Sequence, residues 1–167
     1  MNLKKLLFLI FFLNLTVGQA QSSIEKILSK YNSHSTPYIS VEELKMLHSD
    51  ANVVVLDARE EEEFEVSHLK KALFVGYSTF STKEISHLIT NKSALIVVYC
   101  SLGIRSETIS EKLKNAGYTN IRNLYGGIFE WKNKGYAVFD ANGKETEKIH
   151  AFSKHWSKYL TNGEKVY

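Results

Sequence analysis

The single cysteine of this 167-residue chain stands in the segment VVYCSLGIRS, directly after a run of apolar residues. A glycine follows Cys100 by three positions and an arginine follows it by five. A cysteine becomes a nucleophile when it loses its proton, but a buried cysteine is often only a small apolar side chain of the core. The residues around Cys100 decide between these two interpretations.

The segments on either side of Cys100 predict a strand, a tight turn and a helix. Residues 94–99 (ALIVVY) are apolar throughout, which is typical of a strand buried on both faces of a parallel sheet. Gly103 permits a tight turn, and a helix is expected at residues 106–116, before Gly117. Such a turn collects backbone N–H groups and the positive end of the helix around one point. This environment stabilises a thiolate, so the pattern favours a reactive Cys100.

Strands and helices alternate along the rest of the chain. Ser40 and Ser81 each precede a glutamate by three positions, which is a helix-capping signature. The alternation indicates one α/β domain with a mostly parallel sheet, and such sheets bind ligands at the carboxyl ends of their strands. Further strands are expected at residues 53–56, 72–75 and within 119–127, and further helices within 22–31, 41–47, 81–90 and 128–135.

Several charged side chains near strand ends allow a catalytic or a structural interpretation. Asp57 and Arg59 are candidate acid and base, but hydrogen bonds that fix a turn are the preferred role. Arg105 either steers an anionic donor or pairs with a carboxylate such as Asp57. The four glutamates at 60–63 are expected to form a solvated first helical turn. His68 is a candidate base, with a structural role preferred.

Three segments in order resemble the motifs of the rhodanese-like sulfurtransferases. VVYCSLGIRS resembles their active-site loop, C-x-x-G-x-R-S. The segment DAREEEEFEVSHLKKALFV resembles the upstream motif D-x-R-x-x-x-E-[FY]-x-x-G-H-I-x-G-A. The segment NLYGGIFEWKNKGY resembles the downstream motif N-L-x-G-G-x-x-x-W-x-x-x-G. The resemblance covers residues 40–136.

The resemblance implies a parallel sheet flanked by helices on both faces, and sulfur transfer in two steps. Cys100 would take the outer sulfur of a donor (thiosulfate, or a persulfide or thiol) as a persulfide and pass it to a thiol or a cyanide-like acceptor. The chemistry needs neither a metal nor an organic cofactor. Asp57 and Arg59 are expected to support the site. Substrate binding is expected from the loop that follows Cys100: Ser101, Leu102, Gly103, Ile104, Arg105 and Ser106.

The chain departs from the family pattern at four positions. Ser67 and Lys71 stand where the family usually has glycines, so two turns are expected to differ locally. Ser101 and Leu102 stand where some thiosulfate-using members have basic residues. The loop is therefore expected to bind thiosulfate weakly and to present Leu102 as an apolar edge to the ligand.

Two other functions fit the same residues. A carrier or protein-binding module would keep the fold and deliver sulfur only to a docked partner protein. Dual-specificity phosphatases share the fold, but five residues separate their cysteine from their arginine, whereas four separate Cys100 from Arg105. The smaller loop suits sulfur better than a phosphate, so a sulfurtransferase is preferred.

The first 20 residues have the layout of a secretory signal peptide. Lys4 and Lys5 precede an apolar segment at residues 6–15, and Gly18 and Ala20 suit a cleavage site. The apolar segment is shorter than the ~20 residues that span a bilayer. An exported protein, periplasmic or secreted, is therefore expected. Three further parts are expected after the signal peptide: an N-terminal extension at 21–37, a rhodanese-like domain at 38–140, and a helical C-terminal extension at 141–167 that packs on the domain.

The charge of the chain favours no polyanionic partner. Of its 21 basic side chains, two lie in the expected signal peptide, so 19 basic side chains face 18 acidic ones in the remainder. This near balance predicts neither nucleic-acid binding nor a stable association with membranes. The expected partners are a small sulfur donor, a small acceptor and, for a carrier, an acceptor protein.

Overall fold

Five parallel strands form the central sheet of the structure, a computed structural model that describes residues 23–47 and 52–167. Because β4 is the middle strand, with β2 and β5 as its neighbours, Cys100 follows the centre of the sheet. The predicted parallel sheet is confirmed. In spatial order the strands are β1 (Tyr38–Ile39), β5 (Ile121–Leu124), β4 (Leu95–Tyr99), β2 (Val53–Asp57) and β3 (Leu73–Phe74).

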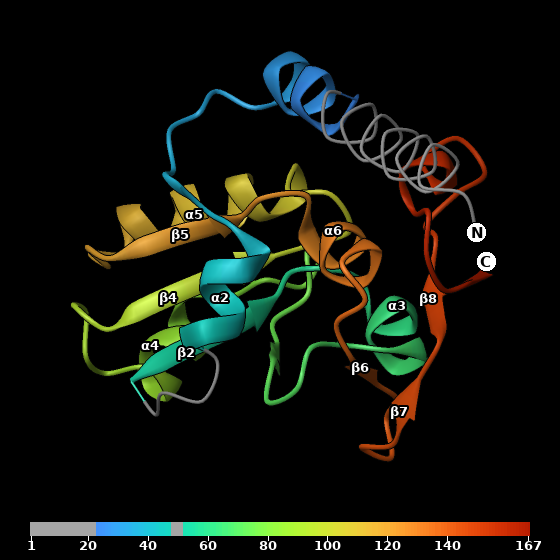
Figure 1. The fold of residues 1–167 in the computed structure, drawn as a ribbon. Coiled ribbons are helices and arrows are strands. Elements are labelled where there is room, and N and C mark those ends of the chain that lie inside the picture. Colours follow the sequence, from blue (N-terminus) through green and yellow to red (C-terminus); the bar gives the residue numbers. More distant parts are fainter. Residues whose placement is uncertain (1–22, 48–51) are drawn as a thin grey trace, which may run out of the picture.

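Helices cover both faces of this sheet (Figure 1). Successive side chains of β4 point to opposite faces: Val97 and Tyr99 lie in one apolar cluster, and Ile96 and Val98 lie in the other. Both faces are therefore buried, as the unbroken apolar run predicts. The first cluster includes α2 (Val41–Leu47) and α6 (Gly127–Asn133), and the second includes α4 (Thr82–Leu88) and α5 (Arg105–Asn115).

Local sequence signals place the starts of two helices, α2 and α4. The Ser40 hydroxyl accepts a hydrogen bond from the Glu43 N–H at 3.1 Å, and the Ser81 hydroxyl accepts one from the Glu84 N–H at 3.3 Å.

Lys71 has a φ of +61°, the conformation that glycine favours, so the turn has a left-handed residue without a glycine. The local difference expected at Lys71 is thus one of side chain and not of backbone conformation.

The N-terminal segment forms a helix over residues 23–31, as predicted. Ile24 and Leu28 are buried in the same cluster as α6. The short edge strand β1 was not expected; it pairs in parallel with β5, and Asn32 lies in the loop that leads to it.

The prediction of a C-terminal helix is wrong. Residues 148–150 form strand β8 (Lys148–His150), which pairs in parallel with β9 (Glu164–Val166). Between them, only the 3-10 turn Ser157–Tyr159 is helical. Pairing with β9 outweighs the apolar spacing that suggested a helix, and the φ of +62° at Phe152 cannot continue a right-handed helix. The extension nevertheless packs on the domain, because Ile149 and Leu160 are fully buried in its core.

Two more elements complete this side of the molecule. Helix α3 (Glu61–Val66) lies beside β8, and β6 (Val138–Phe139) pairs antiparallel with β7 (Glu145–Thr146) (Figure 1). The C-terminal segment thus runs along the same end of the sheet as the loop that follows Cys100. No helix within residues 23–47 and 52–167 has both the length and the apolar character needed to cross a bilayer.

Candidate active site

Cys100 is the first residue after β4, and its side chain is almost fully buried. The loop folds back on the sulfur because Gly103 takes a φ of +108°, which few other residues adopt. The Gly103 N–H then donates to Cys100 Sγ at 3.1 Å, and Ser106 Oγ lies 3.5 Å from the same sulfur. The loop and the first turn of α5 thus bring donors to the thiol, as the sequence predicts.

These contacts change the acidity of the thiol. Burial alone raises the pKa of Cys100, but the positive charge of Arg105 and the hydrogen bonds from Ser106 and Gly103 outweigh it. The net effect lowers the pKa of Cys100 below its ordinary value. A lower pKa means a larger thiolate fraction at neutral pH, and the thiolate is the nucleophilic form of cysteine.

Arg105 pairs with a carboxylate, one of the two roles expected for it, but the carboxylate is that of Glu63 and not that of Asp57. Its two terminal nitrogens lie 2.7 and 2.8 Å from the two carboxylate oxygens of Glu63. Ser101 Oγ accepts from Arg105 at 3.0 Å and donates to Glu63 at 3.0 Å. Glu63 is 1 % exposed, so it does not belong to a solvated turn as expected. Burial alone would raise the pKa of Glu63. The hydrogen bonds and charge of Arg105, with the charge of Arg59, outweigh that burial and lower the pKa of Glu63.

Asp57 and Arg59 make the kind of hydrogen bonds that the preferred structural role requires. Both are fully buried, and Arg59 Nη2 lies 2.6 Å from Asp57 Oδ2 and 2.6 Å from the carbonyl oxygen of Ser67. The Tyr99 hydroxyl also donates to Asp57. Burial alone would lower the pKa of Arg59, but the charge and hydrogen bonds of Asp57, together with the charges of Tyr99 and Glu63, outweigh it and raise that pKa. This pair ties the end of β2 to the segment directly after α3. Helix α3 is the element that carries Glu63.

Two asparagines that the sequence analysis did not single out hold the loop. Asn123, at the end of β5, accepts from Ser106 Oγ at 2.7 Å and donates to the Gly103 carbonyl at 2.8 Å. Asn32 donates to the same carbonyl at 2.9 Å. Asn123 could have been found from its place in the downstream family motif. Asn32 could not, because it lies in the N-terminal extension, outside the family motifs. His68 stacks on Phe64, in keeping with a structural role.

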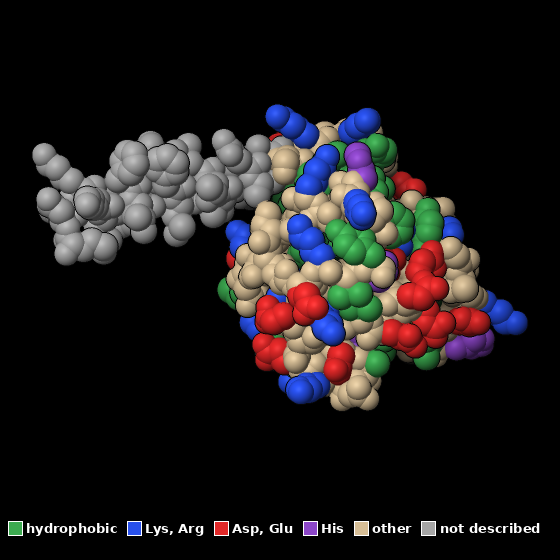
Figure 2. Space-filling model, turned by 90° about the vertical axis from the view of Figure 1, so that its right-hand side faces the viewer, with side chains coloured by type: hydrophobic (Ala, Val, Ile, Leu, Met, Phe, Trp, Pro, Cys, Tyr) green, Lys and Arg blue, Asp and Glu red, His purple; other side chains and the backbone are tan. Residues whose placement is uncertain are grey.

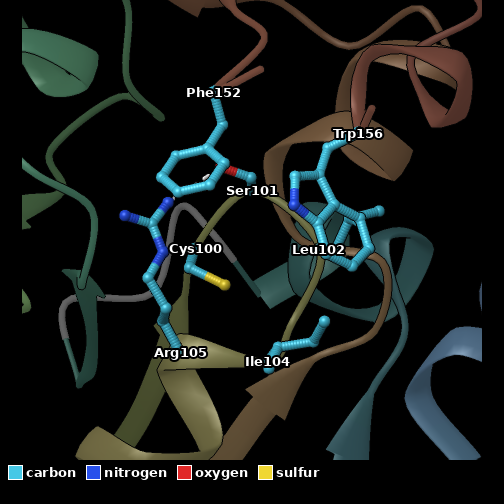
Figure 3. A pocket seen from close by; sticks show the side chains of 7 residues that line it. All are labelled: Cys100, Ser101, Leu102, Ile104, Arg105, Phe152 and Trp156. Atoms are coloured by element: carbon cyan, nitrogen blue, oxygen red, sulfur yellow. Dashed lines mark hydrogen bonds between the residues drawn. The ribbon is translucent and has the colours of Figure 1, made fainter. Parts of the chain in front are cut away.

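A pocket of about 110 Å³ opens above the sulfur. Figure 3 shows Cys100 Sγ pointing into the space between Arg105, Ile104 and Leu102. Leu102 is only 3 % exposed, so it is an inner wall of the pocket and not its edge. Phe152 and Trp156, from the C-terminal extension, also line the pocket, with Phe152 beside Arg105 and Trp156 beside Leu102 in Figure 3. Neither aromatic residue was expected in the site from the sequence.

The role of Ser106 is testable by a matched pair of variants. Ser106→Ala removes a hydroxyl whose single proton is shared between Asn123 Oδ1, at 2.7 Å, and Cys100 Sγ, at 3.5 Å, so the pKa of Cys100 should rise and alkylation by iodoacetamide at neutral pH should slow several-fold. Ser110 is equally buried one turn later in α5, but its hydroxyl donates to the Ser106 carbonyl. The pH profile of alkylation should therefore move to higher pH in Ser106→Ala and stay in place in Ser110→Ala. Equal profiles in both would contradict the assignment.

Comparisons with known proteins find relatives over part of the chain. A curated relative is the tRNA uridine(34) hydroxylase of Enterobacter sp. (strain 638), 30% identical over 100 residues, which are 58% of this chain and 29% of that protein. Its counterpart in Escherichia coli (strain K12 / DH10B) is 31% identical over the same shares. The chain therefore spans less than a third of the length of these curated relatives.

Solved structures share the fold. The thiosulfate sulfurtransferase of Pseudomonas aeruginosa superposes with a TM-score of 0.60 at 22% identity, over 84% of this chain and 26% of that one. A rhodanese-related protein of Thermoplasma volcanium does so with a TM-score of 0.51 at 26% identity, over 61% of this chain and 96% of that one. The family model of the rhodanese-like domain matches residues 40–134, more than half of the chain. The chain belongs to the rhodanese-like domain family.

Proposed function

We propose that the protein transfers sulfane sulfur through a persulfide on Cys100. The observation that carries the proposal is the buried thiol whose pKa is lowered by Arg105, Ser106 and Gly103. The Cys100 thiolate attacks the outer sulfur of a donor, the donor's sulfur–sulfur bond breaks, and the leaving group departs with the electron pair. An acceptor thiolate or cyanide then attacks the terminal sulfur and restores the thiolate.

The surrounding residues support this chemistry by holding the nucleophile in place. The carbonyls of Cys100 and Ser101 accept from the N–H groups of Ile128 and Phe129 at the start of α6, at 2.9 and 3.2 Å. The Gly103 carbonyl is engaged by two asparagines. A loop fixed from outside the pocket keeps its N–H donor on the sulfur in both steps, as a preorganised site requires.

The test is a loading and discharge experiment on the purified protein. After incubation with a thiosulfonate, the intact mass should rise by one sulfur atom, and cyanide should remove that atom as thiocyanate. Steady-state turnover with cyanide or small thiols supports an enzyme, whereas loading without turnover supports a carrier that needs a docked protein. A protein that never gains sulfur, or that hydrolyses p-nitrophenyl phosphate instead, would contradict the proposal.

Export forms a separate part of the proposal. Residues 1–20, the expected signal peptide, lie outside the described residues. The layout of Lys4, Lys5, Gly18 and Ala20 supports cleavage after Ala20. Protein recovered from the periplasm or medium of an expressing bacterium should therefore begin at Gln21, which N-terminal sequencing checks. Recovery only from the cytosol with Met1 retained would contradict export but would leave the sulfur chemistry intact.

A further inference from the structure

Two aromatic side chains of the C-terminal segment are held over the reactive thiol. Phe152 sits at a φ of +62°, an unusual conformation for a bulky residue, and its N–H donates to His150 Nδ1 at 3.2 Å. Trp156 contacts Tyr31 of the N-terminal helix and Tyr159, with ring centroids 5.9 and 6.1 Å apart. The backbone at Phe152 is therefore held within the C-terminal segment, and the Trp156 ring is held by contacts with the N-terminal helix and with Tyr159.

The charge of Arg105 is already matched inside the protein. It is the only cationic side chain among the described residues that line the pocket. Glu63 takes both of its terminal nitrogens, and the Phe152 ring centroid lies 4.7 Å from the centre of its guanidinium group. A second, distant negative charge on a ligand would find little compensation here. The pocket is thus a poor match for thiosulfate, which is a small dianion.

The remaining walls are apolar. Leu102, Ile104, Phe152 and Trp156 line most of the pocket. Its volume of about 110 Å³ is smaller than that of an enclosed cavity that accepts benzene, roughly 150 Å³, but this pocket is open to solvent on one side. Phe152 is 47 % exposed, and Figure 2, which looks onto the side with the C-terminal strands, shows apolar side chains gathered near the middle of this face. A ligand with a compact apolar body fits this space and its mouth.

We infer that the physiological donor carries its sulfane sulfur on an apolar organic group, of the size of a benzene ring or a short alkyl chain, which lies between Phe152, Trp156 and Leu102. This inference rests on the proposed persulfide chemistry at Cys100. With an organic thiosulfonate, the Cys100 thiolate bonds to the outer sulfur, the sulfur–sulfur bond breaks, and the sulfinate leaves with the electron pair. One thiolate and one anionic donor give one persulfide anion and one sulfinate, so no oxidant or reductant is needed.

The test compares donors that differ only in the body that carries the sulfur. Benzenethiosulfonate, methanethiosulfonate and thiosulfate are each used with cyanide as acceptor. The value of kcat/KM should be highest for benzenethiosulfonate and lowest for thiosulfate, and the benzene-to-methane ratio should be roughly tenfold or more because an aromatic ring is buried. A kcat/KM for thiosulfate that equals or exceeds the benzenethiosulfonate value would overturn the inference.

Variants separate the pocket from the intrinsic reactivity of the donors. Phe152→Gly removes the ring at a position whose backbone suits glycine, so the fold should be retained. It should lower the benzene-to-methane ratio several-fold, and Trp156→Ala should do the same. Leu88→Ala, which truncates an exposed side chain of α4, should leave the ratio unchanged. Ratios that stay constant in both pocket variants overturn the inference, whereas failure of every donor to load sulfur overturns the proposed function itself.

Discussion

Replacing Cys100 with serine is expected to abolish sulfur transfer while the domain stays folded. A serine hydroxyl is almost fully protonated at neutral pH, and it has no sulfur on which to hold a persulfide. The rate of thiocyanate formation should fall by at least about 10³-fold, because loss of a covalent nucleophile commonly costs more than that. The intact mass of Cys100→Ser should show no added sulfur after incubation with any donor.

The fold should tolerate this change because the new hydroxyl replaces the sulfur at a place that already holds hydrogen-bonding groups. The Gly103 N–H and the Ser106 hydroxyl both lie within reach of the buried position, so the serine oxygen is not left unpaired. The urea unfolding midpoint of Cys100→Ser should stay close to that of the natural protein. More than a few per cent of residual transfer activity in a folded variant would place the chemistry elsewhere.

The strand, loop and helix around Cys100 were predictable because their determinants are local. The apolar run of β4, the glycine at 103 and the helix that ends before Gly117 act within a few residues of one another. The same is true of the Asp57–Arg59 pair, whose partners are two residues apart. Local patterns of this kind fix the backbone and, with it, the position of Cys100.

The partner of Arg105 was not predictable by the same means. Residues 60–63 are four consecutive glutamates, so the residue type does not show which of them pairs with Arg105. The one that pairs, Glu63, lies 42 residues from Arg105 in the chain. Only the placement of α3 against the loop selects it. The aromatic wall was missed for a related reason: Phe152 and Trp156 are four residues apart and suit a helix, but pairing of β8 with β9 overrides that pattern.

Replacing Gly127 with alanine is expected to damage both stability and activity. A methyl group there would lie 2.2 Å from the Cys100 carbonyl oxygen and 2.8 Å from the carbonyl carbon of Ser101, and neither backbone atom is free to yield. The residue also has a φ of +56°. The left-handed conformation costs about 1–2 kcal/mol for alanine, and forced overpacking costs about 1–3 kcal/mol more. The free energy of unfolding should therefore fall by about 2–5 kcal/mol.

The catalytic loss in Gly127→Ala should exceed what instability alone explains. The N–H groups at the start of α6 hold the carbonyls of Cys100 and Ser101, so a shift of this helix moves the proposed site. A shift of the loop by about 1 Å can lower the rate about 10²-fold. Gly143→Ala is the matched control: its φ is +73°, but an added methyl group meets nothing within 4 Å. Measured at a temperature where both variants are folded, kcat/KM should fall in Gly127→Ala and be retained in Gly143→Ala. If the two variants lose equal stability and both retain full activity, the close approach of Gly127 to Cys100 does not position the loop. The added methyl group clashes with the backbone of Cys100 itself. The two variants therefore test whether the proposed site needs glycine at position 127 for close packing of α6.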